Sequence, residues 1–90
     1  MAWKVELSTE ADRQFDKLDP QITRRILKFL HERVAQLENP RSIGEALHGA
    51  KLSEFWKYRI GDYRPICSIE DKQVLILVLR IGHRREVYDR

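Results

Sequence analysis

The 90-residue sequence predicts an α+β fold, in which an N-terminal strand and a helical hairpin pack on one face of a largely antiparallel four-stranded sheet. Three observations predict it: an alternating segment at residues 2–7, two helical patterns within residues 8–38, and three strand patterns from residue 55 onward. Helices followed by a run of strands favour this class over an alternating parallel sheet. The sequence contains no repeat or linker, so we expect one domain over residues 1–90.

Local signals justify the first two elements. Residues 2–7 alternate between polar and apolar side chains, as a half-buried strand does. Ser8 and Thr9 then offer an N-cap, and Asp12 follows Thr9 by three residues as in a capping box. The sequence therefore predicts a first helix of about three turns that ends near Leu18.

The second helix has the clearest pattern in the chain. Asp19 and Pro20 supply its N-cap and its first helical residue. Apolar residues then recur at spacings of three and four and form one stripe: Ile22, Ile26, Phe29, Leu30, Val34 and Leu37. Asn39 and Pro40 interrupt the pattern, so the helical hairpin is predicted to span residues 8–38.

The second half of the sequence is read as a loop and three strands. Residues 41–51 contain Gly44 and Gly49 without any period, and they are predicted to be a loop. Strands are expected at residues 55–60, 63–69 and 74–81. The last of these is almost wholly aliphatic, which is typical of a central strand buried on both faces.

A predicted two-residue hairpin turn at Gly61-Asp62 sets the register of the first two of these strands. It places Arg59 opposite Arg64, and residues that face each other share a side of the sheet. One face, called the open face below, then carries Phe55, Lys57, Arg59, Arg64 and Ile66. The other face is apolar and is placed against the helices: Trp56, Tyr58, Ile60, Tyr63, Pro65, Cys67 and Ile69.

The same alternation assigns the faces of the third strand. Its odd positions are uniformly apolar and are expected on the helix side: Leu75, Leu77, Leu79 and Ile81. Its even positions then join the open face: Val74, Ile76, Val78 and Arg80. This assignment requires an odd-numbered loop around residues 70–72, because a slip of one residue would invert every side chain.

A basic cluster is therefore predicted on the open face: Lys57, Arg59, Arg64 and Arg80, with Arg84 nearby. Like charges placed directly opposite, as Arg59 and Arg64 would be, destabilise a sheet, so such a pair indicates a functional demand. The alternative interpretation is that acidic residues of the loops or the tail neutralise the cluster.

The distribution of charge agrees with an anionic partner. The net charge is +3, and residues 51–90 hold all of the excess, with nine basic against six acidic residues. This favours RNA, DNA or an acidic protein segment as the partner, although ordinary surface charge is an equal alternative. Cys67 is the single cysteine, and no apolar run is long enough for a leader or a membrane span. We therefore expect a cytoplasmic protein that makes no membrane contact.

The sequence offers no metal or cofactor motif. His31, His48 and His83 are far apart and no HExxH, CxxC or glycine-rich phosphate loop is present, so neither a metal nor a cofactor is expected. A Ser/His/Asp triad is not legible, although its members need not be neighbours in sequence.

Lysine, arginine, tyrosine and histidine side chains are enough to cleave RNA. The RNA 2′-OH can attack its own 3′ phosphate, and guanidinium groups stabilise the charge that develops on the phosphoryl oxygens. A lysine whose pKa is lowered by neighbouring cations could accept the 2′-OH proton. DNA lacks the 2′-OH, so this chemistry would be specific for RNA.

Two segments carry a family resemblance: F-W-K-Y-R-I-G-D-Y-R at residues 55–64 and I-G-H-R-R-E-V-Y at residues 81–88. Together with the helical hairpin, they resemble the RelE family within the RelE/ParE superfamily of type II toxin–antitoxin systems. The resemblance implies a metal-independent endoribonuclease, an mRNA interferase that cuts mRNA in the ribosomal A site. It also implies a cognate, RelB-like antitoxin, with operator DNA bound only through the toxin–antitoxin complex.

The resemblance also implies roles for individual residues. Lys57 resembles the family's proposed general base, and Arg64 the arginine that stabilises the phosphate. Arg84 resembles a general acid or charge stabiliser, and Tyr88 a tyrosine that orients or stacks on the RNA. Arg59 departs from the family pattern, because it stands where the best-known members have a second lysine and arginine is a poor base.

Further residues are expected to support the site or bind RNA phosphates: Arg59, Arg80, His83, Arg85 and Phe55. His83 could share the proton transfer, since histidine changes charge near neutrality, and Phe55 could stack on a base. A purely structural interpretation is that Tyr88 packs the tail on the sheet and His83 ends a strand.

Two other functions remain open from the sequence. ParE-like toxins resemble this fold but act on DNA gyrase and need no RNA-cleaving residues, which the retained Lys57, Arg64, Arg84 and Tyr88 argue against. The other alternative is a basic module that binds RNA or a protein and has lost catalysis, as the Arg59 substitution would allow.

Overall fold

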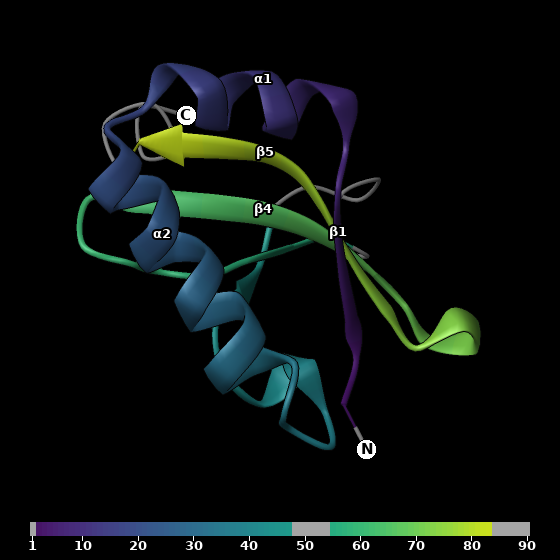
Figure 1. The fold of residues 1–90 in the computed structure, drawn as a ribbon. Helices are drawn as coiled ribbons and strands as arrows, with labels where there is room; N and C mark the ends of the chain where they lie inside the picture. The colour runs from purple at the N-terminus through teal and green to yellow at the C-terminus, as the bar shows by residue number, and fades with distance from the viewer. Residues whose placement is uncertain (1, 48–54, 84–90) are drawn as a thin grey trace.

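A computed structural model describes residues 2–47 and 55–83 and confirms the α+β class (Figure 1). The helices are α1 (Thr9–Lys17) and α2 (Pro20–Phe29), and a single π-helical turn (Leu30–Val34) continues α2. The strands are β1 (Lys4–Leu7), β2 (Glu45–Ala46), β3 (Phe55–Lys57), β4 (Tyr63–Glu70) and β5 (Leu75–His83). Within the described residues, no helix is both long and apolar enough to cross a membrane.

Within the part of the chain that the structure describes, the sheet has five strands rather than the four expected, in the order β1-β5-β4-β3-β2. The additional strand is β2, which pairs antiparallel with β3 inside the segment predicted to be a loop. Strand β1 runs parallel to β5, whereas β4 is antiparallel to both of its neighbours. The sheet is therefore mixed, with one parallel pair at its β1 edge. Gly49 and His48, from the predicted loop, lie outside the described residues.

Helix α1 begins where the cap was expected and is tied directly to the sheet. Ser8 is the N-cap, and its Oγ accepts a hydrogen bond from the Ala11 amide at 3.0 Å. The Ser8 hydroxyl in turn donates to the carbonyl oxygen of Leu79 in β5 at 2.6 Å. Asp19 caps α2 as predicted, with Oδ1 2.8 Å from the Gln21 amide nitrogen. Each cap satisfies an amide that the helix itself leaves unpaired.

Helix α2 ends earlier than residue 38, the end predicted from its apolar stripe. A π-helical turn widens its last turn, so that the Ala35 amide donates to the Leu30 carbonyl at 2.8 Å. The Ala35 carbonyl then accepts from the Trp3 amide at 2.8 Å, just before β1. The end of the helix is therefore set by a contact with a distant segment, which the periodicity of α2 does not reveal.

Both helices cover the same side of the sheet, as Figure 1 shows, and the core lies between the layers. The helices contribute Ala11, Phe15, Ile26, Leu30 and Val34, and the sheet contributes Tyr58, Ile60, Cys67, Ile76, Val78 and Ile81. The prediction that the apolar face of the β3–β4 hairpin lies against the helices is therefore confirmed.

The predicted faces of β5 are wrong over its first half. The turn after β4 has an even number of residues, because Glu70 pairs with Leu75. Val74 closes this turn in the left-handed region at φ 52°. As a result, Ile76 and Val78 face the helices, whereas Leu75 and Leu77 belong to the open face.

An irregularity in the β4–β5 ladder restores the expected faces over the second half of β5. Ile66 pairs with Arg80 but Cys67 pairs with Val78, so Leu79 is an extra residue on β5. Such a bulge shifts the alternation by one position. Arg80 therefore lies on the open face and Ile81 in the core, as the sequence predicted.

Candidate functional site

The register of the sheet brings four predicted cations together on the open face. Lys57 pairs with Ile66, which pairs with Arg80 on the next strand. The bridge between Ile60 and Tyr63 keeps the same register to the end of the hairpin, so Arg59 stands opposite Arg64. Strands lie about 4.8 Å apart, so the basic cluster spans about 10 Å across the sheet. A surface of this kind can bind the phosphates of a polyanion.

Arg64 is fixed by the turn that precedes it. Its side chain is 3% exposed, and its Nη1 donates to the carbonyl oxygens of Gly61 at 2.8 Å and Tyr63 at 2.9 Å. Gly61 adopts φ 58°, which fits the tight turn predicted from the sequence. Two carbonyl acceptors on one nitrogen restrict the orientation of the guanidinium plane before any ligand binds.

Lys57 is also buried, at 5% exposed, and an acidic residue that the sequence analysis missed lies beside it. Glu45 is its partner in the β2–β3 ladder, and Glu45 Oε2 lies 4.0 Å from Lys57 Nζ. A two-residue strand has no detectable alternation, so Glu45 was hidden in the predicted loop. The local sequence signal for this close contact is the preceding Gly44. Its φ is 82°, and a Cβ atom there would lie 2.6 Å from the Lys57 carbonyl oxygen.

Arg59 and Arg80 differ from Arg64 and Lys57 in that both are exposed. Arg59 follows the end of β3 and Arg80 lies on β5, so both border the buried cations where a solvent-facing guanidinium can reach a large ligand. Phe55 is half-buried and lies on the same face, opposite Ser68 on β4. The site therefore combines two fixed cations with two accessible ones.

His83 is the one described candidate that the structure separates from the basic cluster. It pairs with Tyr63 at the end of β5, and the two rings form an edge-to-face contact at 5.5 Å between centroids. Tyr63 packs against the core, so this contact belongs to the helix side of the sheet. Arg84, Arg85 and Tyr88 lie outside the described residues.

The groups behind the basic cluster are held in their neutral forms. Burial raises the pKa of the Cys67 thiol to about 12, and burial likewise raises the pKa of Tyr58 well above its usual value. The Tyr58 hydroxyl donates to the Pro40 carbonyl oxygen at 2.7 Å. These two groups therefore keep their protons near neutral pH, and they support the sheet without taking part in proton transfer.

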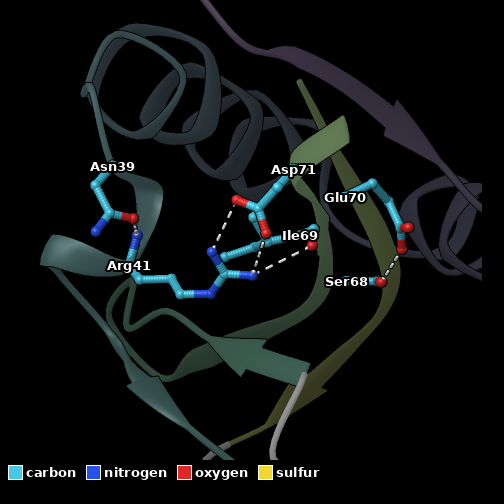
Figure 2. A network of polar contacts seen from close by, with 6 residues as sticks. All are labelled: Asn39, Arg41, Ser68, Ile69, Glu70 and Asp71. Atoms are coloured by element: carbon cyan, nitrogen blue, oxygen red, sulfur yellow. Dashed lines mark hydrogen bonds and ion pairs between the residues drawn. The ribbon is translucent and has the colours of Figure 1, made fainter. Parts of the chain in front are cut away.

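A bidentate ion pair connects the segment before β2 to the end of β4 (Figure 2). The Arg41 guanidinium donates to both carboxylate oxygens of Asp71 at 3.0 Å and to the Ile69 carbonyl oxygen at 3.3 Å. This hydrogen bonding lowers the pKa of the Asp71 carboxyl below its usual value. Nearby, the Ser68 hydroxyl donates to the Glu70 carboxylate. The segment that leads to Glu45 is thus attached to the end of β4 and to the turn that follows it.

Comparison with known proteins agrees with this architecture. Toxin RelG of Mycobacterium tuberculosis is 29% identical over 90 residues, the full length of both chains. The M. tuberculosis toxin–antitoxin complex RelBE2 contains a chain of similar structure, with a TM-score of 0.81, 27% identity and 93% of each chain covered. A variant of E. coli toxin RelE bound to an antitoxin RelBc peptide gives a TM-score of 0.75 at 24% identity, over 99% of this chain and 93% of that one.

The family assignment comes from the sequence profile of the ParE toxins of type II toxin–antitoxin systems (parDE), which matches residues 5–88. The match spans nearly the whole sequence, including the β3–β4 hairpin and β5 that carry the basic cluster. The chain therefore belongs to the ParE toxin family of type II toxin–antitoxin systems, within the RelE/ParE superfamily.

Proposed function

We propose that this toxin is a metal-independent endoribonuclease that cleaves mRNA, in the ribosomal A site, and so inhibits translation. The observation that carries the proposal is the burial of Lys57 and Arg64 on a sheet face that also presents Arg59 and Arg80. Buried cations are costly unless a function or a partner requires them. Binding of DNA or of an acidic protein segment needs only positive charge, whereas in-line attack by a 2′-OH uses a lysine to accept a proton and an arginine to stabilise the phosphate charge.

The reaction would proceed by attack of the RNA 2′-oxygen on the adjacent phosphorus atom, with departure of the 5′-oxygen of the next nucleotide. A 2′,3′-cyclic phosphate forms as the bond to the 5′-oxygen breaks. Negative charge accumulates on the phosphoryl oxygens, where the fixed guanidinium of Arg64 would stabilise it. Because Arg64 is already oriented by two carbonyl oxygens, little reorganisation is needed as the charge develops.

The remaining roles follow the family resemblance. Lys57 would accept the 2′-OH proton or stabilise the attacking oxygen, and Arg84 would protonate or stabilise the leaving 5′-oxygen. Tyr88 and Phe55 would stack on bases, while Arg59, Arg80 and Arg85 would bind flanking phosphates. His83 would act from the end of β5, next in sequence to Arg84, and not from within the basic cluster.

The test is primer extension of a defined mRNA on translating ribosomes, in the presence of a chelator. Wild-type protein should give discrete cuts, and Arg64→Ala should reduce their rate by about a hundredfold while the protein stays folded. Arg84→Ala should have a similar effect if the tail supplies the leaving-group function. Circular dichroism and thermal denaturation would confirm that each variant is folded.

Arg13→Ala is the matched control for these variants. It removes the same charge from an exposed position on α1, which belongs to the helical layer and not to the open face. Cleavage by Arg13→Ala should equal that of the wild type. Intact mRNA with a well-folded wild-type protein would refute the proposed endoribonuclease.

Inhibition of DNA gyrase is the second candidate, because the matching family profile is that of the ParE toxins. A gyrase supercoiling assay with the same protein preparations separates the two functions. Inhibition by wild type and by Arg64→Ala alike, together with intact mRNA, would establish the gyrase inhibitor. A protein that binds RNA but passes neither test would be a non-catalytic binding module.

We also propose that a RelB-like antitoxin neutralises this toxin by covering the open face or displacing the C-terminal tail. The proposal is supported by the similarity to the M. tuberculosis complex RelBE2, in which toxin and antitoxin are bound together. An acidic, partly helical segment would complement the basic cluster. A structure of the complex that leaves Lys57 and Arg64 undisturbed would contradict this mode of neutralisation. Binding of operator DNA is expected only through the toxin–antitoxin complex.

A further inference from the structure

The pair formed by Glu45 and Lys57 is strongly asymmetric. The Lys57 side chain is 6% exposed, whereas the Glu45 side chain is 62% exposed, and the two charged atoms lie 4.0 Å apart. An exposed carboxylate of this kind adds little to stability, because water screens the attraction. Any consequence of the pair must therefore be sought in the position of the ammonium group.

Three side-chain contacts, called the β2 anchors here, fix the segment that leads into β2. The Tyr58 hydroxyl binds the Pro40 carbonyl at 2.7 Å, and the Trp56 indole nitrogen donates to the Ile43 carbonyl at 2.7 Å. The third anchor is the bidentate pair between Arg41 and Asp71 (Figure 2). A strand of two residues could not hold its position by its own ladder, so these anchors place it.

Gly44 brings the anchored segment unusually close to Lys57. A Cβ atom added at Gly44 would lie 2.6 Å from the Lys57 carbonyl oxygen and 2.7 Å from the Trp56 indole nitrogen. No residue with a side chain fits that space, and the φ of 82° also favours glycine. The next residue in the chain, Glu45, is thereby held directly opposite Lys57.

A carboxylate on this face has an electrostatic cost for an RNA-binding protein. It repels the phosphates that Arg59, Arg64 and Arg80 would attract. Lysine, however, carries its charge on a flexible four-carbon stem with many rotamers. A carboxylate carried on an anchored backbone segment directly opposite Lys57 attracts the ammonium towards one point of the open face. The structure thus places a charge that is unfavourable for RNA binding beside Lys57, where it can orient the ammonium group.

We propose that Glu45 is a positioning residue of the RNA-cleaving site, whose carboxylate holds the Lys57 ammonium in place for reaction. The inference rests on the proposed endoribonuclease function and adds a residue to its site. The β2 anchors act indirectly, because they hold the backbone segment that carries Glu45.

Glu45→Gln distinguishes a positioning role from a simple surface charge, because the two roles predict different cleavage rates. If Glu45 were only a surface charge, its neutralisation would strengthen RNA binding and leave the cleavage rate unchanged. As a positioning residue, its loss should lower the single-turnover rate at saturating toxin about tenfold, while the half-saturating concentration stays equal or falls. Glu45→Asp keeps the charge on a shorter side chain and should give an intermediate rate.

Glu6→Gln is the matched control for this experiment. Glu6 is exposed on β1 and pairs with Leu77, so it lies on the open face about 14 Å across the strands from Lys57. The variant has the same change in net charge and should cleave at the wild-type rate. An unchanged rate in Glu45→Gln, or an equal loss in Glu6→Gln, would overturn the proposal.

A second readout keeps this inference separate from the proposed reaction. The Nζ signal of Lys57 in a nitrogen-15 NMR spectrum reports the environment of the ammonium without any RNA. Glu45→Gln should shift or broaden this signal, whereas Glu6→Gln should not. If wild-type protein cleaved no RNA, the proposed function would fail, and this spectrum would still decide whether Glu45 positions Lys57. An unchanged Lys57 signal in Glu45→Gln would refute the positioning role.

Discussion

Strand β4 separates two buried environments of different chemistry. On its helix face, Pro65 and Cys67 are fully buried, and the thiol lies within the apolar core. On its open face, Arg64 is buried almost as completely, at 3% exposed, but its guanidinium donates to two carbonyl oxygens of the adjoining turn. One face therefore excludes water by packing, and the other keeps a charge by hydrogen bonding.

This difference indicates what each face contributes. Apolar packing across the helix face supplies the free energy of folding, because the hydrophobic effect scales with the area removed from water. Burial of Arg64 supplies no comparable stability, since desolvation of a charge offsets most of the attraction it gains. Substitutions on the helix face should thus act on stability, and substitutions in the basic cluster should act on activity.

The largest effect is expected for the chemical reactivity of Cys67 on the helix face. Burial raises its pKa from 9.0 to about 12, so the reactive thiolate should be about a thousandfold scarcer near pH 8 than in the unfolded chain. Alkylation by iodoacetamide, followed by mass spectrometry, should be correspondingly slow in native protein and fast in urea. Equal rates in the two states would show that this face admits water.

A pair of neighbouring substitutions on β5 compares the two faces directly. Ile76 is fully buried against the helices, whereas Leu77 points to the open face and is half-buried. Ile76→Ala should lower the free energy of unfolding by about 3 kcal/mol, and Leu77→Ala by about 1 kcal/mol. Urea denaturation would measure both. A larger loss of unfolding free energy for Leu77→Ala than for Ile76→Ala would instead support the faces of β5 predicted from the sequence.

Tyr58 tests a polar contact made from the helix face. Tyr58→Phe keeps the ring but removes the donor to the buried Pro40 carbonyl. An acceptor left without its donor should cost about 1–2 kcal/mol of unfolding free energy. RNA cleavage should fall by less than is expected for Glu45→Gln, because the other two β2 anchors remain. Thermal denaturation and the primer-extension assay together would measure these effects. A large loss of cleavage in a stable Tyr58→Phe protein would contradict the division between the faces.

Val74 is expected to give a smaller change, in the opposite direction. Its backbone adopts φ 52°, which disfavours a β-branched residue, and it closes the turn between β4 and β5. Val74→Gly should raise the free energy of unfolding by about 0.5 kcal/mol, because relief of strain exceeds the added entropy of the unfolded chain. Val74→Ala retains a Cβ atom and should gain less. Destabilisation by glycine would imply that the Val74 side chain makes a contact that matters.

The smallest effect is expected for the exposed ion pair of Arg41 and Asp71, which contrasts with the buried charge of Arg64. The pKa of Asp71 is lowered in the folded state, so the pair stabilises the protein above pH 3.8, the usual pKa of this carboxyl. That contribution, below about 1 kcal/mol, is lost as the pH falls through the lower folded value. Denaturation curves of wild type and Asp71→Asn should therefore differ at pH 7 and converge in acid. A constant difference at all pH values would exclude the ion pair as its cause.

Features that depend on residues close in sequence could be predicted, whereas features that depend on distant contacts or on unusual backbone conformations could not. The β3–β4 hairpin was predictable because Gly61 marks its turn, and the turn alone fixes which residues face each other. The faces of β5 were not, because Val74 adopts a conformation that valine rarely takes and Leu79 adds a bulge. Neither feature has a signal in hydrophobic alternation.

The site divides in the same way. Lys57, Arg59 and Arg64 could be placed on one face because they lie in the hairpin. The prediction for Arg80 is correct only because the even-numbered turn after β4 and the bulge at Leu79 cancel each other. Glu45 could not be placed, since its position depends on contacts of Tyr58, Trp56 and Asp71 with a segment that shows no period of its own.

The parallel pairing of β1 with β5 has a consequence for the synthesis of the protein. Ser8 and Leu79, which are hydrogen-bonded to each other, are separated by 71 positions in the chain. Contacts between such distant segments form late, because a long loop must close before they are made. During translation, β1 leaves the ribosome well before β5 has been made. The sheet and its open face therefore assemble only after β5 has been synthesised, so a nascent chain that has not yet reached β5 lacks the basic face.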